Sequence, residues 1–175
     1  GDFSQTTFSN NVSDLVDAAN WLAEQESPPV ILIGHSLGGT AMLQASLEID
    51  TAVAVATIGS PAPPEHVTHL FADHEADIIR DGAAEVQLAG RPFTIRREFI
   101  ENLGKHPLAE TVHNLRKALL ILHSPIDDTV TIDNASQLFS AAMHPKSFVS
   151  LDHSDHLLSN AADSAYAGTV LAGWA

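Results

Sequence analysis

Short apolar segments and longer segments with periodic apolar positions alternate along this 175-residue chain. Four short segments, rich in Val, Ile, Leu and Ala, are typical of strands in a parallel sheet, which is buried on both faces. In the longer segments, apolar residues recur every three or four positions, which predicts helices that flank the sheet. Alternating strands and helices indicate an α/β fold with a parallel sheet of about four strands. The predicted strands are 30–33, 52–58, 118–122 and 147–151, and the predicted helices are 9–26, 37 onward, 132–143 and 159–174.

The segment 63–115 interrupts this alternation and is too long for an ordinary connection. It begins with an acidic, histidine-rich stretch, and its last part predicts short helices. Between them, residues 85–95 predict a two-stranded hairpin that turns at Ala89 and Gly90. Because the segment lies between two core strands, we expect it to cap the carboxyl ends of the sheet, with a peripheral decoration as the alternative. A chain of this length is expected to form one domain, residues 1–175.

The chain is strongly acidic, with 22 Asp and Glu residues against 8 Lys and Arg residues and a net charge of −14. Such a charge repels phosphate backbones and anionic lipids, so neither nucleic acid nor a membrane is expected as a partner. There is no cysteine, which excludes disulfides and thiol catalysis. Without a membrane-length apolar stretch or a secretion signal, we expect a soluble, cytoplasmic protein. Because the chain begins at Gly1, we expect either that residues were removed ahead of it or that it is part of a longer protein.

The motif Gly34-His35-Ser36-Leu37-Gly38-Gly39 directly follows the first predicted strand and opens a predicted helix. A serine on such a sharp strand-to-helix turn presents its Oγ above the sheet edge, as a nucleophile requires. We expect glycine at positions 34 and 38, since a Cβ there would collide with the neighbouring strand or helix. The Leu37 N–H, at a helix N-terminus, is a candidate oxyanion donor. The alternative is a glycine-rich turn with an idle serine.

A serine nucleophile needs a histidine base and a carboxylate that orients the base. Catalytic groups of α/β folds gather at the carboxyl ends of strands, which restricts the search to the loops 123–130 and 152–158. In the first loop we favour Asp127 over Asp128, because Asp127 is nearer the strand and Asp128 suits a helix cap. In the second we favour His156 over His153, because the apolar residues after His156 can anchor the loop. The chain order Ser, Asp, His is the one that this kind of turn uses.

Further polar residues have weaker claims to a role. His35 in the motif and Ser60 after the second strand are candidates for substrate contacts. His66 and His69, three positions apart, and His74 have a spacing that a helix could turn into a metal site. We prefer a solvated acidic helix without metal, whose apolar residues face inward. These inward residues would be Val67, Leu70 and Phe71.

The motif at 34–39, the loop 123–130 and the pair Asp155-His156 together resemble the α/β-hydrolase family, over essentially the whole chain. More narrowly, three segments resemble a bacterial subgroup in which the hydrolase can be fused to an OsmC-like redox domain. These segments are 6–9, 89–95 and 144–152.

The resemblance implies Ser36 as nucleophile, Asp127 as acid and His156 as base, hydrolysis of esters, and no cofactor. Members of the family carry further strands before the helix expected at Ser9, and a loop among them donates the second oxyanion N–H. The expected fold is therefore a partial α/β-hydrolase fold. Loss of one oxyanion donor costs on the order of 10²–10³ in rate, so we expect weak catalysis. Without those strands, one edge of the strand 30–33 has no partner strand, and unpaired strand edges favour association.

Three functions agree with these residues. The first is a serine hydrolase that cleaves small or medium acyl esters through an acyl-enzyme. The second is a non-catalytic hydrolase core that acts by association. The third is an acyltransferase or perhydrolase that uses the same triad with an acceptor other than water. The expected partner in the reaction is a small-molecule ester. The unpaired edge of the strand 30–33 is expected to be covered by a second copy in a homodimer, by another fragment of a precursor, or by rearranged terminal segments.

Overall fold

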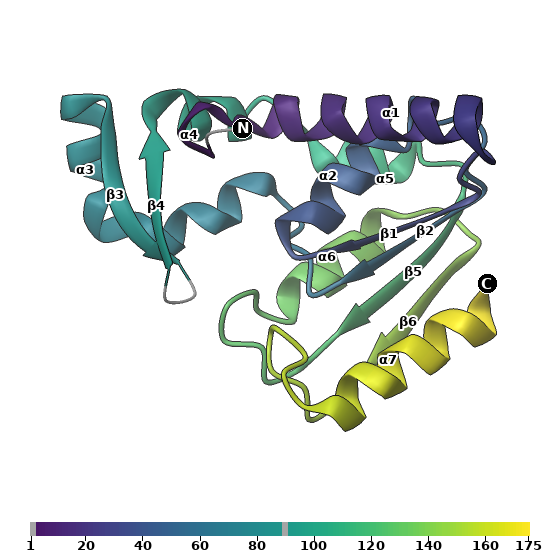
Figure 1. Cartoon of the computed structure of the whole chain (residues 1–175). Helices are drawn as coiled ribbons and strands as arrows, with labels where there is room; N and C mark the ends of the chain where they lie inside the picture. Colours follow the sequence, from purple (N-terminus) through teal and green to yellow (C-terminus); the bar gives the residue numbers. More distant parts are fainter. Residues whose placement is uncertain (1–2, 89–90) are drawn as a thin grey trace.

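A computed structural model describes residues 3–88 and 91–175 of the chain. Four parallel strands form one sheet in the order β1-β2-β5-β6 (Figure 1). The register is continuous across the sheet, with Ile33 opposite Ala56 and Ala56 opposite Leu120. The parallel sheet predicted from the apolar segments is confirmed. The strands are β1 Ile31–His35, β2 Ala54–Ile58, β5 Ala118–His123 and β6 Lys146–Ser150.

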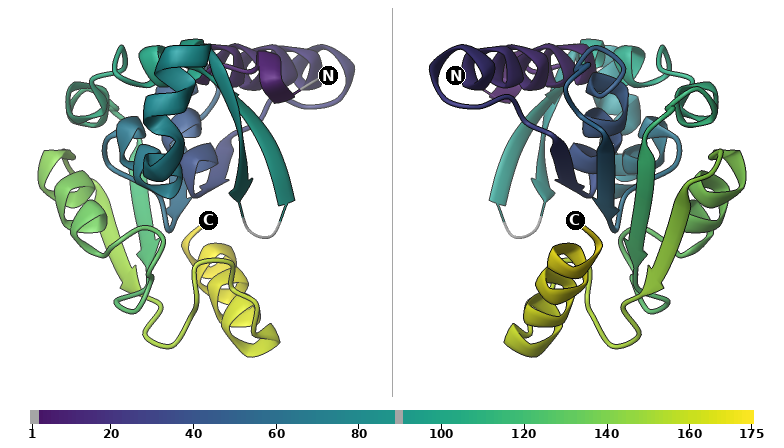
Figure 2. Two further views of the ribbon diagram at one scale, coloured as in Figure 1. Left: turned by 90° about the vertical axis from the view of Figure 1, so that its left-hand side faces the viewer. Right: turned by 90° about the vertical axis from the view of Figure 1, so that its right-hand side faces the viewer.

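Helices cover both faces of the sheet (Figures 1 and 2). One face carries α2, with α1 packed upon it, together with α5 and α6, whereas α7 lies on the opposite face. The Thr7 side chain caps α1 by accepting a hydrogen bond from the N–H of Asn10. The helices that flank the sheet are α1 Phe8–Gln25, α2 Leu37–Ala45, α5 Leu108–His113, α6 Asp133–Ala141 and α7 Ala161–Trp174.

Alternate residues of each core strand point to opposite faces, which divides the core in two. In β5, Leu119 and Ile121 join the larger cluster beneath α1, α2 and α6. Leu120 and Leu122 join the smaller cluster, which α7 covers. The unbroken apolar sequence of β5 thus reflects burial on both faces.

The segment between β2 and β5 contains most of the remaining elements. Its hairpin β3–β4 is antiparallel and forms a sheet of its own, as residues 85–95 predict. The turn predicted at Ala89 and Gly90 lies outside the described residues. The other elements are η1 Phe3–Gln5, η2 Pro64–Phe71, α3 Ala72–Asp81, β3 Ala83–Leu88, β4 Arg91–Arg96 and α4 Arg97–Leu103.

The inserted segment has two parts with different positions. The hairpin and α3 lie beyond the carboxyl ends of the core strands (Figures 1 and 2). In contrast, α4 and α5 return along the helical face, where α4 contacts α1 and α5 contacts α2 and α6. A cap over the carboxyl ends therefore stays a prediction for the first part, whereas the second part belongs to the helical layer.

Strand β1 is an edge strand, pairing only with β2 among the described residues. The expectation that this strand is buried on both faces is wrong, because Ile33 is 48% exposed while its neighbour Leu32 is buried. Leu32 faces the large core under α1 and α2, but α7 does not reach the opposite face at β1 (Figure 2). What covers the free edge stays a prediction.

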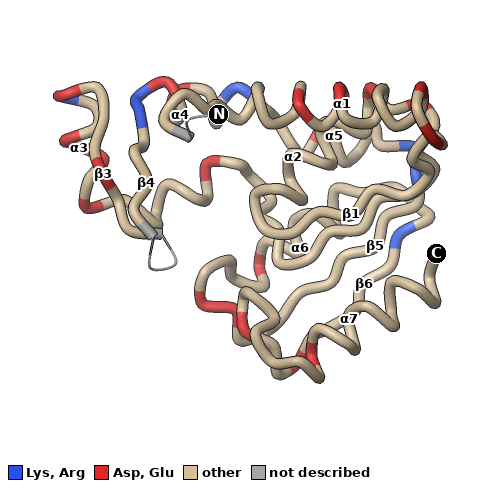
Figure 3. Tube along the Cα trace, viewed as in Figure 1, with Lys and Arg blue, Asp and Glu red and all other residues tan. Residues whose placement is uncertain are grey.

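Charges are distributed unevenly over the fold. Acidic positions lie along the outer side of α1, on α3 and on loops at the carboxyl end of the sheet (Figure 3). At the opposite end, Lys117 Nζ donates to the carbonyl oxygens of Ile49 and Ala52, and Lys146 Nζ donates to the end of α6. Among the described residues, no helix combines the length and apolar character that crossing a bilayer requires.

Candidate active site

Ser36 lies in the turn between β1 and α2, at the carboxyl end of the sheet. Its backbone has φ 53° and ψ −135°, a region that residues with side chains rarely occupy. The Ser36 N–H donates a 2.9 Å hydrogen bond to the carbonyl oxygen of Ile58, the last residue of β2. The neighbouring strand thus holds a strained serine in place, as expected for an exposed nucleophile.

Two glycines let β1 and α2 approach closely beside this serine. A Cβ on Gly34 would lie 2.5 Å from the Cα of Gly39, and a Cβ on Gly39 would lie 2.0 Å from Ser60 Oγ. Any side chain at either position would therefore push the elements apart. The expectation that a Cβ at position 38 would collide with a neighbouring element is wrong, since a Cβ there would meet nothing within 4 Å. The steric requirement falls on Gly39, because its backbone faces the strands while Gly38 is exposed.

The structure brings Ser36, His156 and Asp127 together in one hydrogen-bonded line. His156 Nδ1 lies 2.7 Å from Asp127 Oδ2, and His156 Nε2 lies 3.0 Å from Ser36 Oγ. Since a carboxylate can only accept, Nδ1 carries the proton and donates it to Asp127. Nε2 is then free to accept the hydrogen bond of the Ser36 hydroxyl. This is the tautomer that a general base for Ser36 requires.

The Asp127 carboxylate is almost fully buried and accepts hydrogen bonds at both oxygens. Oδ1 accepts from the backbone N–H of Thr129 at 2.9 Å and of Val130 at 2.8 Å, which leaves Oδ2 to His156. Burial alone would raise the pKa of Asp127, but the hydrogen bonds from His156 and these N–H groups hold its pKa below the ordinary value. The carboxylate therefore stays ionised beside the imidazole.

The two residues that compete with this assignment lie elsewhere. Asp128 is exposed, and its Oδ1 accepts a hydrogen bond from the Thr129 hydroxyl at 3.3 Å. His153 is exposed on the loop after β6. The structure thus places His156 within hydrogen-bond reach of Ser36 and Asp127 within hydrogen-bond reach of His156, rather than these neighbours.

Gly59 is a residue of this site that the sequence reasoning did not single out. It follows β2 with φ +55°, and a Cβ there would lie 3.2 Å from Asp127 Oδ2 and 3.4 Å from His156 Nδ1. Only a residue without a side chain can take this backbone conformation beside the Asp127–His156 hydrogen bond without strain. The sequence feature that could have identified Gly59 is its position directly after a strand that ends at the same edge of the sheet as the strands before Ser36 and Asp127.

His123 was also missed as part of the site. It ends β5, is fully buried, and its Nε2–H donates to the carbonyl oxygen of Val130 at 2.8 Å. This bond closes the loop that carries Asp127, and Nε2 lies 3.8 Å from Asp127 Oδ2. Burial lowers the pKa of His123, which keeps the ring neutral at neutral pH. Nδ1 is buried without a hydrogen-bond partner among the described residues.

The Leu37 N–H is the first backbone donor of α2. The first N–H groups of a helix have no acceptor within the helix, and the Ser36 side chain makes no capping hydrogen bond here. The helix dipole adds partial positive charge at this end. Leu37 therefore has the position expected of an oxyanion donor next to Ser36.

The two candidates for substrate contacts have different surroundings. Ser60 is 1% exposed and packs against Gly39, so the structure contradicts a direct contact with substrate. It is buried because the short side chain fills the space between β2 and α2. His35 is exposed, but its Nε2 lies 2.7 Å from the carbonyl oxygen of His156. His35 thus contacts the loop that carries the candidate base.

The histidine-rich segment forms η2 and the start of α3. Val67 and Phe71 are buried as expected, whereas the expectation that Leu70 faces inward is wrong, since its side chain is 40% exposed. His66 and His69 contact each other, with ring centroids 4.6 Å apart. Within residues 3–88 and 91–175, no group of His, Asp or Glu side chains is arranged to hold a metal ion.

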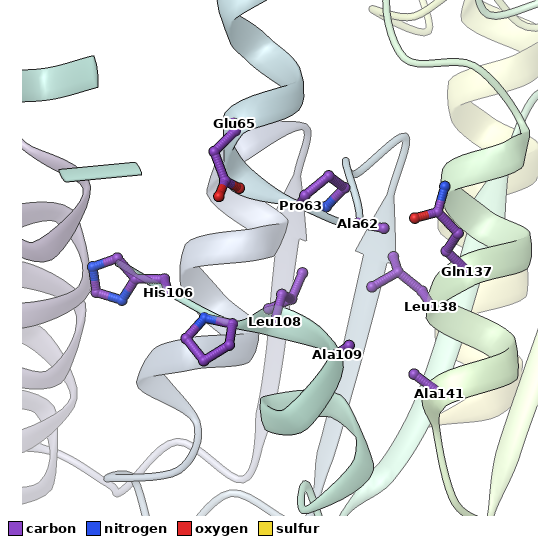
Figure 4. A pocket seen from close by; sticks show the side chains of 10 residues that line it. Ala62, Pro63, Glu65, His106, Leu108, Ala109, Gln137, Leu138 and Ala141 are labelled. Atoms are coloured by element: carbon purple, nitrogen blue, oxygen red, sulfur yellow. The ribbon is translucent and has the colours of Figure 1, made fainter. Parts of the chain in front are cut away.

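A separate cavity of about 240 Å³ lies between η2, α5 and α6 (Figure 4). Its wall is mostly apolar, and Glu65, His106 and Gln137 add polar groups at its rim. None of the three residues of the hydrogen-bonded line contributes to its wall. This cavity is therefore distinct from the surface at Ser36.

Comparison with known proteins identifies relatives of the chain. The model of the alpha/beta hydrolase family matches residues 1–169. The esterase domain of a Rhodothermus marinus protein is 48% identical, with a TM-score of 0.80 over 97% of this chain and 68% of that chain. A search of curated proteins gives no match.

More distant solved structures share the fold alone. Alpha/beta hydrolase domain-containing protein 10 from mouse is 23% identical, with a TM-score of 0.78 over 99% of this chain and 71% of that chain. Est1E from Butyrivibrio proteoclasticus is 15% identical, with a TM-score of 0.69 over 95% of this chain and 70% of that chain. The family match covers nearly the whole chain and agrees with the sheet and its helices. The chain belongs to the alpha/beta hydrolase family.

Proposed function

We propose that this chain is a serine hydrolase that cleaves carboxylic esters of small or medium acyl chains through an acyl-enzyme. The observation that carries the proposal is the hydrogen-bonded line from Asp127 through His156 to Ser36. The three residues come from three separate strand ends, 120 and 29 residues apart along the chain. A strained serine at one end of this line has the surroundings of a nucleophile.

In the acylation step, Ser36 Oγ attacks the ester carbonyl carbon while His156 Nε2 takes the hydroxyl proton. The Asp127 carboxylate, kept ionised by its hydrogen bonds, stabilises the imidazolium that forms. The carbonyl oxygen becomes an oxyanion, which the Leu37 N–H stabilises at the start of α2. The intermediate collapses when His156 returns the proton to the leaving alcohol, and the acyl group stays on Ser36.

In the deacylation step, water takes the place of the alcohol. His156 Nε2 removes a proton from the water, which attacks the acyl carbon and forms a second oxyanion beside Leu37. Collapse of this intermediate breaks the bond to Ser36 Oγ, and His156 returns the proton to the serine. The products are a carboxylic acid, an alcohol and the free enzyme.

Three observations support an ester as substrate. The relative at 48% identity is described as an esterase domain. Ile126 and Leu157, which adjoin the acid and the base in the sequence, are apolar and 62% and 61% exposed, so both loops of the site carry apolar surface, which suits an uncharged substrate. The net charge of −14 disfavours strongly anionic substrates.

Stopped-flow kinetics with p-nitrophenyl acetate, butyrate and octanoate tests the proposal. We expect a burst of p-nitrophenol equal to the enzyme concentration, followed by slower turnover, with the shorter two esters preferred. Ser36→Ala should abolish the burst, while Ser140→Ala, an exposed serine on α6, should leave it unchanged. Absence of any turnover that depends on Ser36 would leave a non-catalytic role instead.

A further inference from the structure

His35 and Ser36 are adjacent in the sequence, and both contact His156. Ser36 Oγ reaches the imidazole, whereas His35 Nε2 lies 2.7 Å from the backbone carbonyl oxygen of the same residue. A carbonyl oxygen can only accept, so His35 Nε2 carries a proton and donates it. The two rings also pack together, with centroids 4.9 Å apart at 44°. His35 is therefore bound to the backbone of His156 and packed against its side chain.

Besides the packing of Leu151 and Leu158 in the smaller hydrophobic cluster and the hydrogen bond from the Leu151 N–H to His123, the loop that carries His156 has few other connections to the rest of the molecule. Residues 151–160 form neither helix nor strand. Hydrogen bonds within the loop join Ser154 to Leu151 and Asp155 to Leu158 and Ser159. Among described residues 152–159, Asp152 accepts a hydrogen bond from Ser150 Oγ at the end of β6, and the other hydrogen bonds that reach another element come from His156: its ring to Asp127 and Ser36, and its carbonyl oxygen to His35.

These three bonds constrain His156 differently. The bond between Nε2 and Ser36 must change during catalysis, because Nε2 gains and loses a proton in each step, whereas Nδ1 keeps its proton and its bond to Asp127. The bond from His35 involves only the backbone and persists whether the imidazole of His156 is neutral or charged. Since His35 ends β1, which the sheet holds rigid, its donor is fixed relative to Ser36.

We propose that His35 is a positioning residue, whose Nε2–H holds the backbone of His156 so that the imidazole stays in line between Asp127 and Ser36. The inference rests on the proposed serine hydrolase function. It assigns His35 no contact with substrate, which distinguishes it from the substrate-binding role that the sequence suggests. A displacement of a catalytic group by about 1 Å can cost on the order of 10²-fold in rate, so one such bond can be decisive.

Three variants separate hydrogen bonding from bulk. In His35→Gln the side-chain amide can place a donor near the position of Nε2, whereas the shorter His35→Asn cannot reach it. His35→Phe keeps a ring against His156 but has no donor. The exposed position of His35 makes each substitution compatible with folding, which thermal unfolding checks directly.

Steady-state kinetics with p-nitrophenyl butyrate gives the test. We expect His35→Asn and His35→Phe to lower kcat by about 10-fold to 100-fold with little change in KM, and His35→Gln to recover most of kcat. A raised KM at unchanged kcat in these variants would assign His35 to substrate binding and overturn the proposal. Equal kcat in the Gln and Asn variants would overturn it too, because the donor would then not matter. A wild-type protein without Ser36-dependent turnover would refute the proposed function itself, a result distinct from both.

Discussion

Gly59 lies directly against Asp127, since a Cβ on Gly59 would come within 3.2 Å of Asp127 Oδ2. This contact places the end of β2 behind the hydrogen bond between Asp127 and His156. The end of β2 therefore limits the space in which Asp127 and His156 form their hydrogen bond. Because Gly59 has no side chain, that space stays open.

Gly59→Ala should consequently lower kcat strongly, while its effect on the free energy of unfolding should be no larger than that of the same change at another glycine with positive φ. The left-handed backbone at φ +55° costs about 1–3 kcal/mol with a side chain, and the methyl group must displace Asp127 or His156. We expect kcat to fall on the order of 10²-fold. Gly82→Ala is the matched control, because Gly82 has φ +87° but no atom within 4 Å of an added Cβ. Comparable unfolding free energies with activity lost only at position 59 would support this account, and equal activity would refute it.

Asp127→Asn should disable the base rather than the fold of the site. An amide can donate to Nδ1 of His156, which moves the imidazole proton to Nε2 and removes the acceptor for Ser36. We expect kcat to fall about 10⁴-fold, as loss of an orienting carboxylate does elsewhere. Asp128→Asn, one residue along on the exposed side of the loop, should retain wild-type kcat. Similar losses in both variants would contradict the assignment of Asp127.

The free energy of unfolding should decrease as the pH falls below about 6.5. Burial lowers the pKa of His66, His106 and His123 in the folded protein. As the pH falls through 6.5, the unfolded chain takes up protons that the folded chain does not yet bind, so the folded state loses stability down to the folded pKa values. Below the ordinary pKa of Asp127 a further loss follows, because the folded pKa of that carboxyl is lowered.

Urea unfolding between pH 8 and pH 5 measures this dependence. His123→Gln, which can retain a donor to Val130, should flatten the decline. An unaltered slope in His123→Gln would show that His123 titrates normally in the folded protein.

The free edge of β1 leads to a prediction about association. Ile33 is half exposed beside an edge that has no strand partner among the described residues. We expect this 175-residue chain to form a homodimer or a larger species in sedimentation velocity, and Ile33→Lys to shift it toward monomer. Met143→Lys removes a comparable exposed apolar side chain elsewhere and should not. A monodisperse monomer at every concentration would contradict association through this edge.

The core strands and the nucleophile turn could be predicted from the sequence because their signals are local. An apolar segment, a glycine-flanked serine and a helical pattern follow one another within 18 residues of the chain, and the structure has β1, Ser36 and α2 there. Chain order and the rule that loops at strand ends meet indicated the two loops. Both depend on topology, which alternating strands and helices indicate well. Within the two loops, the choice of Asp127 used its nearness to the strand, and the choice of His156 used the apolar residues that follow it.

The rest depends on contacts between distant segments. The packing of the strand ends determines the contacts of Gly59 and His123 and the burial of Ser60. The spacing of residues along the chain does not indicate this packing. Gly38 and Gly39 are adjacent and identical in type, so only the side of the helix that faces β1 decides which one is sterically required. Apolar sequence alone overstated the burial of β1, because burial requires a partner on each face.

Intact-mass labelling with a fluorophosphonate tests the central claim most directly, since the reagent modifies an activated serine. The account predicts one adduct, located at Ser36 by peptide mapping, that is lost in His156→Ala and formed at the wild-type rate in His153→Ala. A folded protein that stays unlabelled, or one labelled equally well without His156, would contradict it.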